Sequence, residues 1–317
     1  MTEMPPQIFD MEQLARNRNR AAENFEAFAF LKQAAVERLE DKLMLVRRSF
    51  SDVLDVGCHS GQVAQMLRAS GKLTSSHSLL QTDISPRFCD IAGRRAPAMV
   101  SPAETLPVEP ASYDAVVSAL FLHWVNDVPG LLTQMRLALR PDGLLLVCLF
   151  GGRTLNELRQ CLAEAETEVS GGMSGRCAPM ADIRDIGGLL QRAGLALPVA
   201  DADLITVTYP NMFRLMADLK GMGEQNALFG KEQHMARRDI FLRAAELYQE
   251  RFSTADGQIK ASFELITLTG WAPHASQQKP LARGSATHSL LEAFEIEQND
   301  PQKPDQESGA ETEQESD

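Results

Sequence analysis

A short glycine-containing turn is the feature of this sequence with the clearest chemical meaning. The β-branched run Asp52–Val56 is followed by Gly57-Cys58-His59-Ser60-Gly61, and a stretch of helical composition begins at Gln62. A strand, a glycine turn and a helix open a βαβ unit, whose turn presents backbone amides and a helix N-terminus to a ligand. The dinucleotide spacing G-x-G-x-x-G fits poorly, because His59 and Gln62 stand where its second and third glycines belong.

The alternative spacing, acidic-x-G-x-G-x-G, suits S-adenosylmethionine. That ligand has no phosphate; its charges are a sulfonium, an ammonium and a carboxylate. Asp55 would supply a negative charge for the ammonium, and Gly57 and Gly61 would let the backbone approach the methionine moiety. His59 replaces the middle glycine. We therefore expect a cofactor site formed by Asp55, Gly57, His59 and Gly61.

A second acidic residue, Asp83, follows Gly61 at the end of the next expected strand. A carboxylate there can accept hydrogen bonds from both ribose hydroxyls of a nucleoside. The alternative is that Asp83 only caps the helix that begins near Pro86, with Ser85 as a rival cap. Glu104 and Ser118 follow later, where we expect the same cleft to continue.

Residues after the buried strand 113–120 are weaker candidates for catalysis. His123 and Trp124 would lie at the carboxyl end of a central strand, where open sheets bind ligands. A histidine beside a tryptophan is more often a packed, hydrogen-bonded pair than a catalyst. The segments 221–224 and 270–274 are either ordinary turns or substrate contacts. No nucleophile elbow, P-loop or metal-ligand spacing is present, so we predict no metal site.

Strands and helices alternate along most of the chain, which predicts an α/β fold with a mostly parallel sheet. Helices are expected within 11–46, and a helical insert is expected at about 211–252, before a last strand. Further helices are expected at 62–69, 86–94, 131–139 and 183–193, and a turn is expected at 140–143. The expected strands are 52–56, 78–83, near 99–100, 113–120, 144–150, 204–209 and 262–271. We expect a Rossmann-like sheet of seven strands.

Composition excludes several classes of protein. The chain of 317 residues has a formal charge of -12, so tight binding to a nucleic-acid backbone is not expected. The five cysteines are scattered, which suits a reducing cytoplasm. No apolar run is long enough to span a membrane, and the first residues show no secretory or transit pattern. The residues from Glu295 to Asp317 are rich in acids and carry almost no apolar side chains, which predicts a disordered tail at 291–317.

Several further motifs resemble known families. The glycine turn, Asp83 and the runs 104–107, 113–118 and 140–143 resemble the class I S-adenosylmethionine-dependent methyltransferases, including ubiquinone-pathway and biotin-pathway enzymes. The runs 122–127, 150–159, 222–226 and 283–287 are similar to the respiratory complex I assembly factor 5 family, the methyltransferase-like arginine hydroxylases. The resemblance extends from about Ile8 to Ala286, nearly the whole expected folded chain.

This resemblance implies S-adenosyl-L-methionine as cofactor and an arginine of a respiratory NADH dehydrogenase subunit as substrate, in a cytoplasmic, bacterial protein. It implies an N-terminal helical extension (1–50), a cofactor-binding domain (51–290) and the acidic tail. Two alternatives stay open: a methyltransferase for a small molecule or carrier protein, or an assembly factor without catalysis. His59 and Pro102 depart from the family pattern, so we expect weakened cofactor binding.

Overall fold

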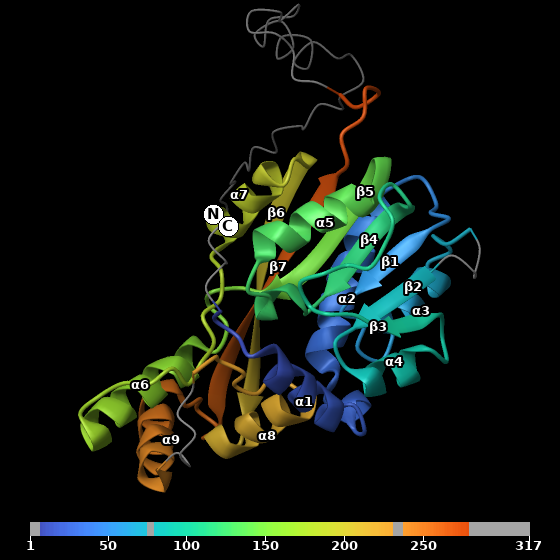
Figure 1. Ribbon diagram of the computed structural model, residues 1–317. Coiled ribbons are helices and arrows are strands. Elements are labelled where there is room, and N and C mark those ends of the chain that lie inside the picture. Colours follow the sequence, from blue (N-terminus) through green and yellow to red (C-terminus); the bar gives the residue numbers. More distant parts are fainter. Residues whose placement is uncertain (1–6, 75–78, 231–236, 279–317) are drawn as a thin grey trace, which may run out of the picture. The chain divides into compact units, whose positions relative to one another are not determined.

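Seven strands form one sheet in the order β3-β2-β1-β4-β5-β7-β6 in the computed structural model, which describes residues 7–74, 79–230 and 237–278 (Figure 1). Strands β1 to β5 pair in parallel, and β7 runs antiparallel to both β5 and β6. The strands are β1 (Val53–Val56), β2 (Leu79–Asp83), β3 (Ala98–Val100), β4 (Tyr113–Ala119), β5 (Leu139–Phe150), β6 (Ala196–Tyr209) and β7 (Ile259–Trp271).

Helices cover both faces of this sheet. One core cluster joins α2 and α3, then α6, α8 and α9, to one face, and a second joins α5 and α7 to the other. The helices are α1 (Met11–Ala21), α2 (Phe30–Leu45), α3 (Gln62–Ala69), α4 (Pro86–Ala92), α5 (Val128–Ala138), α6 (Asn156–Ser170), α7 (Ile183–Arg192), α8 (Met212–Met222) and α9 (Arg238–Phe252). Two 3₁₀ turns, η1 (Phe25–Phe28) and η2 (Leu122–Trp124), complete the described elements.

The sheet order reverses direction between β1 and β4. From β1 the chain proceeds outward through β2 to β3, and it then returns to the other side of β1 as β4. The connections on the two sides of this point diverge, so a crevice opens beyond the carboxyl ends of β1 and β4. Asp55 is in β1, and the turn 57–61 follows it directly. The fold thus places the expected cofactor residues at the reversal point.

The N-terminal helices form part of this structure. Leu31, Ala35 and Leu39 of α2 are buried in the same cluster as Val53 of β1 and Leu67 of α3. Their spacing of three and four residues places them on one face of the helix. Helix α1 contacts α4 and α8 instead, and Asp10 caps its N-terminus by accepting from the Gln13 amide. One or two helices were expected in this segment from the sequence, and the structure has two.

Four elements differ from the expectation, and one of them is β6, which begins at Ala196 and not at Leu204. Residues 140–143 are not a turn between elements but an irregular start of β5: Tyr113 pairs with Leu139 and Ala115 with Leu144, so the intervening residues bulge. The segment 211–252 contains two helices, α8 and α9, with a non-helical stretch after Gly223 that includes the undescribed residues 231–236. Helix α6 was not expected, although its Leu, Ala, Glu and Gln content favours a helix.

Some predictions concern residues outside the described ranges. The expected disordered tail 291–317 and the end of the expected cofactor-binding domain, 279–290, belong to this group. Within the described part of the chain, no helix is both long enough and apolar enough to cross a membrane.

Candidate functional site

The glycine turn has a backbone conformation that depends on glycine. Gly57 has φ of +77°, and a Cβ placed there would overlap the Phe121 side chain. Gly61 has φ of +89°, and a Cβ there would lie 2.8 Å from Gln81 Oε1. The Gly57 and Cys58 amides donate to the Thr82 carbonyl oxygen at 2.8 and 3.0 Å, which fixes the turn against β2. Left-handed backbone and close approach both favour a residue without a side chain here.

Asp55 is a fully buried carboxylate at this turn. Neither of its oxygens accepts a hydrogen bond from a described residue. Burial raises the pKa of Asp55 to about 7, although the neighbouring Lys32 ammonium favours the charged form. A buried carboxylate without hydrogen bonds is costly, and at a ligand-binding edge it indicates a place for a cationic or hydrogen-donating ligand.

Lys32 of α2 enters the cleft from the N-terminal segment. Its Nζ donates to the carbonyl oxygens of Gly57 (3.2 Å) and Ala119 (2.6 Å) and lies 3.1 Å from His59 Nδ1. Burial lowers the pKa of Lys32 to about 8, with Asp55 opposing the shift. The same burial, together with Arg18 and Lys32, holds the pKa of His59 well below its ordinary value. The His59 imidazole is therefore neutral at physiological pH.

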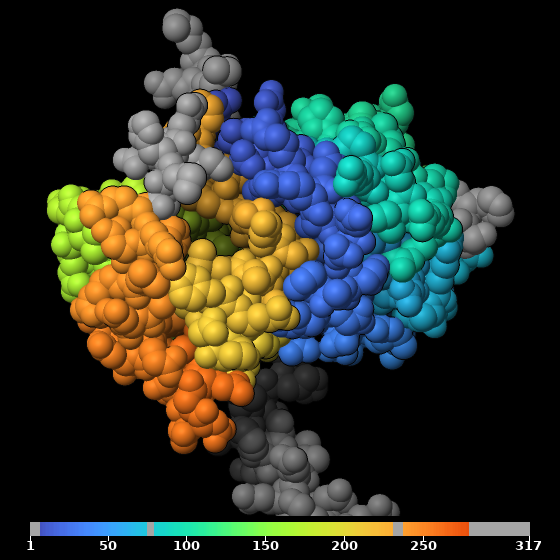
Figure 2. Space-filling model, turned by 90° about the horizontal axis from the view of Figure 1, so that it is seen from below, coloured from blue at the N-terminus to red at the C-terminus, as the bar shows by residue number. Residues whose placement is uncertain are grey.

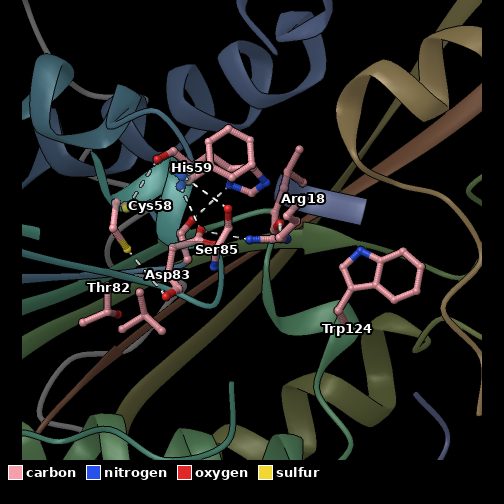
Figure 3. Close-up of polar contacts among 12 residues, drawn as sticks. Arg18, Cys58, His59, Thr82, Asp83, Ser85 and Trp124 are labelled. Atoms are coloured by element: carbon pink, nitrogen blue, oxygen red, sulfur yellow. Dashed lines mark hydrogen bonds and ion pairs between the residues drawn. The ribbon is translucent and has the colours of Figure 1, made fainter. Parts of the chain in front are cut away.

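Asp83 is already hydrogen-bonded on both oxygens (Figure 3). Oδ2 accepts from Arg18 Nη1 at 3.0 Å and from the His59 amide at 3.1 Å, and Oδ1 accepts from the Ser85 amide at 2.9 Å. Ser85, the rival candidate, caps α4 through its hydroxyl, which accepts from the Phe88 amide. Asp83 is thus not the cap of that helix, and its carboxylate belongs to the cleft.

The remaining expected cofactor residues have other partners. Glu104 Oε1 accepts from the Asn126 amide at 2.8 Å, which ties the segment after β3 to the segment after η2. Ser118 is buried and donates from Oγ to the Val56 carbonyl oxygen at 2.6 Å. Neither residue contacts the network around Asp83. That Glu104 and Ser118 contact the cofactor therefore stays a prediction.

His123 and Trp124 meet on a residue from a distant part of the chain. Glu224 Oε2 accepts from Trp124 Nε1 at 2.6 Å and lies 3.1 Å from His123 Nε2. Burial alone would raise the pKa of Glu224, but His123, Arg18 and the hydrogen bond from Trp124 together lower it. Glu224 is therefore a buried, ionised carboxylate. The hydrogen-bonded pair considered from the sequence is present, and it orients this carboxylate.

A cavity of about 300 Å³ lies beside this carboxylate. Figure 2 shows a hollow between the yellow and orange segments that contain α8 and α9. Glu224 and Phe150 line both this cavity and a much smaller void of about 10 Å³ on the side of His59 and Lys32. The larger cavity is mainly apolar, and its lining includes Trp124, Leu155, Leu158, Leu162, Met216, Leu219, Phe241 and Phe263, with Arg159 and Arg176.

A sheet of this order, with β7 antiparallel and an acidic residue at the end of each of β1 and β2, defines a class I S-adenosylmethionine-dependent methyltransferase fold. A family model described as "Methyltransferase domain" matches residues 54–147. A solved structure of a putative methyltransferase from Bacillus halodurans C-125 is similar with a TM-score of 0.53 at 15% identity, covering 76% of this chain and all of the other.

Curated relatives define the family more closely. The chain is 40% identical over 300 residues to "Arginine-hydroxylase NDUFAF5, mitochondrial" of Mus musculus, which covers 91% of this chain and 84% of the relative. It is 31% identical over 291 residues to "Malonyl-[acyl-carrier protein] O-methyltransferase" of Laribacter hongkongensis, covering 87% and 94%. The chain belongs to the class I S-adenosylmethionine-dependent methyltransferase superfamily, in the family of NDUFAF5.

The cofactor of this class is S-adenosyl-L-methionine, and the residues of the cleft suit its chemistry, although they are buried in this structure. The unpartnered Asp55 carboxylate suits the ammonium, and Gly57 and Gly61 let Phe121 and Gln81 pack closely against the turn that follows it. The site is closed in this structure, however, because Asp55, Asp83 and His59 are at most 2% exposed. When bound, the cofactor would supply an activated methyl group, and Asp55 and Asp83 would hold its two ends.

Three functional candidates were missed or weighed lightly from the sequence. Arg18 and Lys32 belong to helices that were expected only as an extension. Lys32 precedes Val36 by four residues on the buried face of α2, and a charged residue on such a face was an available signal. Glu224 was considered only within the segment 221–224, as either an ordinary turn or a substrate contact. Nothing in the sequence indicates that it meets His123, because the two are about a hundred residues apart.

Proposed function

We propose that this protein modifies an arginine side chain of a respiratory NADH dehydrogenase subunit during assembly of that complex. The observation that carries the proposal is the cavity of about 300 Å³ that adjoins the cofactor side through Glu224 and Phe150. A substrate group in this cavity reaches the boundary with the cofactor side at Glu224. The relatives named arginine hydroxylases, which match most of the chain, support the same substrate.

The chemistry of the cavity suits an arginine side chain. Its apolar walls can cover three methylene groups, and the ionised Glu224 offers an oxygen to the guanidinium. Both hydrogen bonds to Glu224 from described residues reach Oε2, so Oε1 can accept from a ligand. Trp124 and His123 hold the carboxylate in one orientation. Binding and orienting a cationic side chain beside the cofactor is what these residues contribute.

The test is mass spectrometry of NADH dehydrogenase subunits from a strain that lacks the gene, complemented with variants of this protein. We expect wild type to restore a modified arginine and Glu224→Gln to lose at least about 90% of it, because a neutral amide forfeits a charge-assisted contact of about 1.5–3 kcal/mol. Glu157→Gln is the matched control, since Glu157 binds Ser262 outside the cavity. Added methyl and added oxygen differ in mass, so the spectrum also identifies the reaction.

An absence of any arginine difference between the deletion strain and the complemented strain would contradict the proposal. Equal modification by wild type and Glu224→Gln would contradict the role of this carboxylate alone.

A second candidate, methylation of a malonyl group on a carrier protein, is favoured by one observation. Arg159 and Arg176 line the same cavity, and each has a buried Nε without a partner among described residues. Guanidinium groups bind carboxylates well, and a malonyl group ends in one. Formation of a methyl ester on malonyl carrier protein is the measurement that would favour this alternative over arginine modification.

A further inference from the structure

The carboxylate expected to bind the cofactor ribose is engaged by a residue of the chain itself. The Arg18 guanidinium and the Asp83 carboxylate are both buried, with side-chain exposures of 1% and 0%, and Nη1 lies 3.0 Å from Oδ2. The second nitrogen, Nη2, donates to the Leu120 carbonyl oxygen at 3.2 Å, and the guanidinium lies 5.0 Å from the centre of the Phe121 ring. Figure 3 shows Arg18 directed toward Asp83.

Asp83 cannot serve Arg18 and a ribose together. A carboxylate offers about four acceptor positions. Arg18, the His59 amide and the Ser85 amide take three of them. Two vicinal hydroxyls need two acceptor positions, and the two amides belong to the turn and to the start of α4, which fix the site. Arg18 is the donor that has to leave.

Other residues of the same N-terminal segment fill the rest of the cleft. The Phe25 ring of η1 stacks on the His59 imidazole, with centroids 5.1 Å apart and planes 20° apart, and meets Phe88 edge-on. Lys32 binds the carbonyl oxygens of Gly57 and Ala119. Asp55, His59 and Asp83 are accordingly at most 2% exposed, whereas a ligand of this size needs a pocket of about 300–1,000 Å³.

One side of η1 packs apart from the two main cores. Phe25, Ala22, Ala29 and Phe88 form a cluster of their own, whereas Phe28 packs against the large cluster on one face of the sheet. The segment between α1 and α2 is short and mostly non-α-helical, which gives a place for the backbone to bend. Elements that move are drawn from parts with few buried apolar contacts.

We propose that α1 and η1 form a latch that closes the cofactor cleft of the free protein, and that the ribose hydroxyls of S-adenosylmethionine compete with Arg18 for Asp83. The latch regulates the site of the proposed function and rests on the assignment of Asp83 as ribose acceptor. The free protein populates the closed state, and the cofactor binds the fraction in which Arg18 has left Asp83. The apparent affinity is reduced by the size of that fraction.

The experiment is calorimetric titration of the full chain with two probes, S-adenosylmethionine and adenosine. Adenosine carries the ribose but no methionine. We expect Arg18→Ala and the milder Arg18→Gln to tighten binding of both probes by about tenfold, because the closed state loses its ion pair. Arg20→Ala is the matched control: it lies on the same helix, and its guanidinium binds Asn17 and the Arg16 carbonyl oxygen, not Asp83.

Stopped-flow binding to wild type adds a measurement that needs no variant. A closed latch predicts an observed rate that reaches a plateau with increasing S-adenosylmethionine, the plateau being the opening rate. This measurement decides the matter if the Arg18 variants fail to fold.

Three outcomes would overturn the latch. Equal affinity of wild type and Arg18 variants would make Arg18 structural. Weaker S-adenosylmethionine binding with unchanged adenosine binding would make Arg18 a ligand of the methionine carboxylate. A rate that rises linearly without a plateau, or no binding by any variant, would exclude a gated site. None of these outcomes alters the mass-spectrometric test of arginine modification, so failure of the latch and failure of the proposed function are distinguishable.

Discussion

The buried Asp55 carboxylate gives the structure a measurable dependence of stability on pH. Its pKa is raised from 3.8 to about 7, first by burial, with Lys32 opposing and Asp83 assisting. The folded protein therefore holds this proton more tightly than the unfolded chain does. Between these two pKa values the folded state has more bound protons, so its stability falls as the pH rises. The contribution is lost progressively and levels off above about pH 7.

The magnitude follows from the size of the shift. Three pKa units at 1.36 kcal/mol each correspond to about 4 kcal/mol over the full range, of which about 3 kcal/mol falls between pH 5 and pH 8. Asp55→Asn keeps the shape of the side chain and removes the titration. We expect the free energy of unfolding of the variant, minus that of wild type, to rise by about 3 kcal/mol from pH 5 to pH 8.

Urea denaturation at pH 5, 6, 7 and 8 measures this difference. The low pKa of His59 makes both proteins less stable at acidic pH, and that effect cancels when the two are subtracted. Asp114→Asn is the control: burial opposes ionisation of Asp114, but hydrogen bonds from Arg140 and the backbone keep its pKa below the ordinary value. Its difference from wild type should be constant over this pH range. A constant difference for Asp55→Asn as well would refute the reasoning.

Two further predictions concern the glycine turn. Gly57→Ala should destabilise the protein by about 2–4 kcal/mol in urea unfolding, because it combines a left-handed backbone with overlap of the Phe121 side chain. The control Gly71→Ala, at φ of +67° with open space around it, should destabilise the protein by only about 1 kcal/mol. Equal losses of stability in the two variants would argue against the overlap. His59→Gly should tighten S-adenosylmethionine binding about tenfold in calorimetry, because the imidazole occupies the cleft. Weaker binding by this variant would show instead that His59 contacts the cofactor.

The parts of the fold governed by local pattern could be predicted from the sequence. The strand before Gly57, the helix after Gly61 and the strand that ends at Asp83 follow from β-branched runs, turn residues and helical spacing. The parts that failed depend on tertiary context. Residues 140–143 have the composition of a turn, yet pairing with β4 and β7 on either side draws them into the start of a strand as a bulge.

The site could be predicted only in part, for the same reason. Asp55 and Asp83 follow from their place at strand ends, but the partners that decide their state, Lys32 and Arg18, come from helices whose residues looked like an extension. Glu224 is joined to His123 by a contact between distant segments. No periodicity or spacing carries such information, because it arises when the helices pack over the sheet.

The buried charges explain why a cleft that is filled in this conformation can still accept a net cation. Three carboxylates, those of Asp55, Asp83 and Glu224, face two cations, Lys32 and Arg18. Burial, with a smaller contribution from Asp83, raises the pKa of Asp55, so the free protein can hold this carboxyl protonated. S-adenosylmethionine carries a sulfonium, an ammonium and one carboxylate, which sum to one positive charge. A ligand of that charge supplies what the cleft lacks and favours ionised Asp55. If Arg18 moves away from Asp83, the cleft holds one cation fewer and its excess of negative charge grows. Electrostatic attraction then favours the cofactor-bound cleft over an empty open cleft.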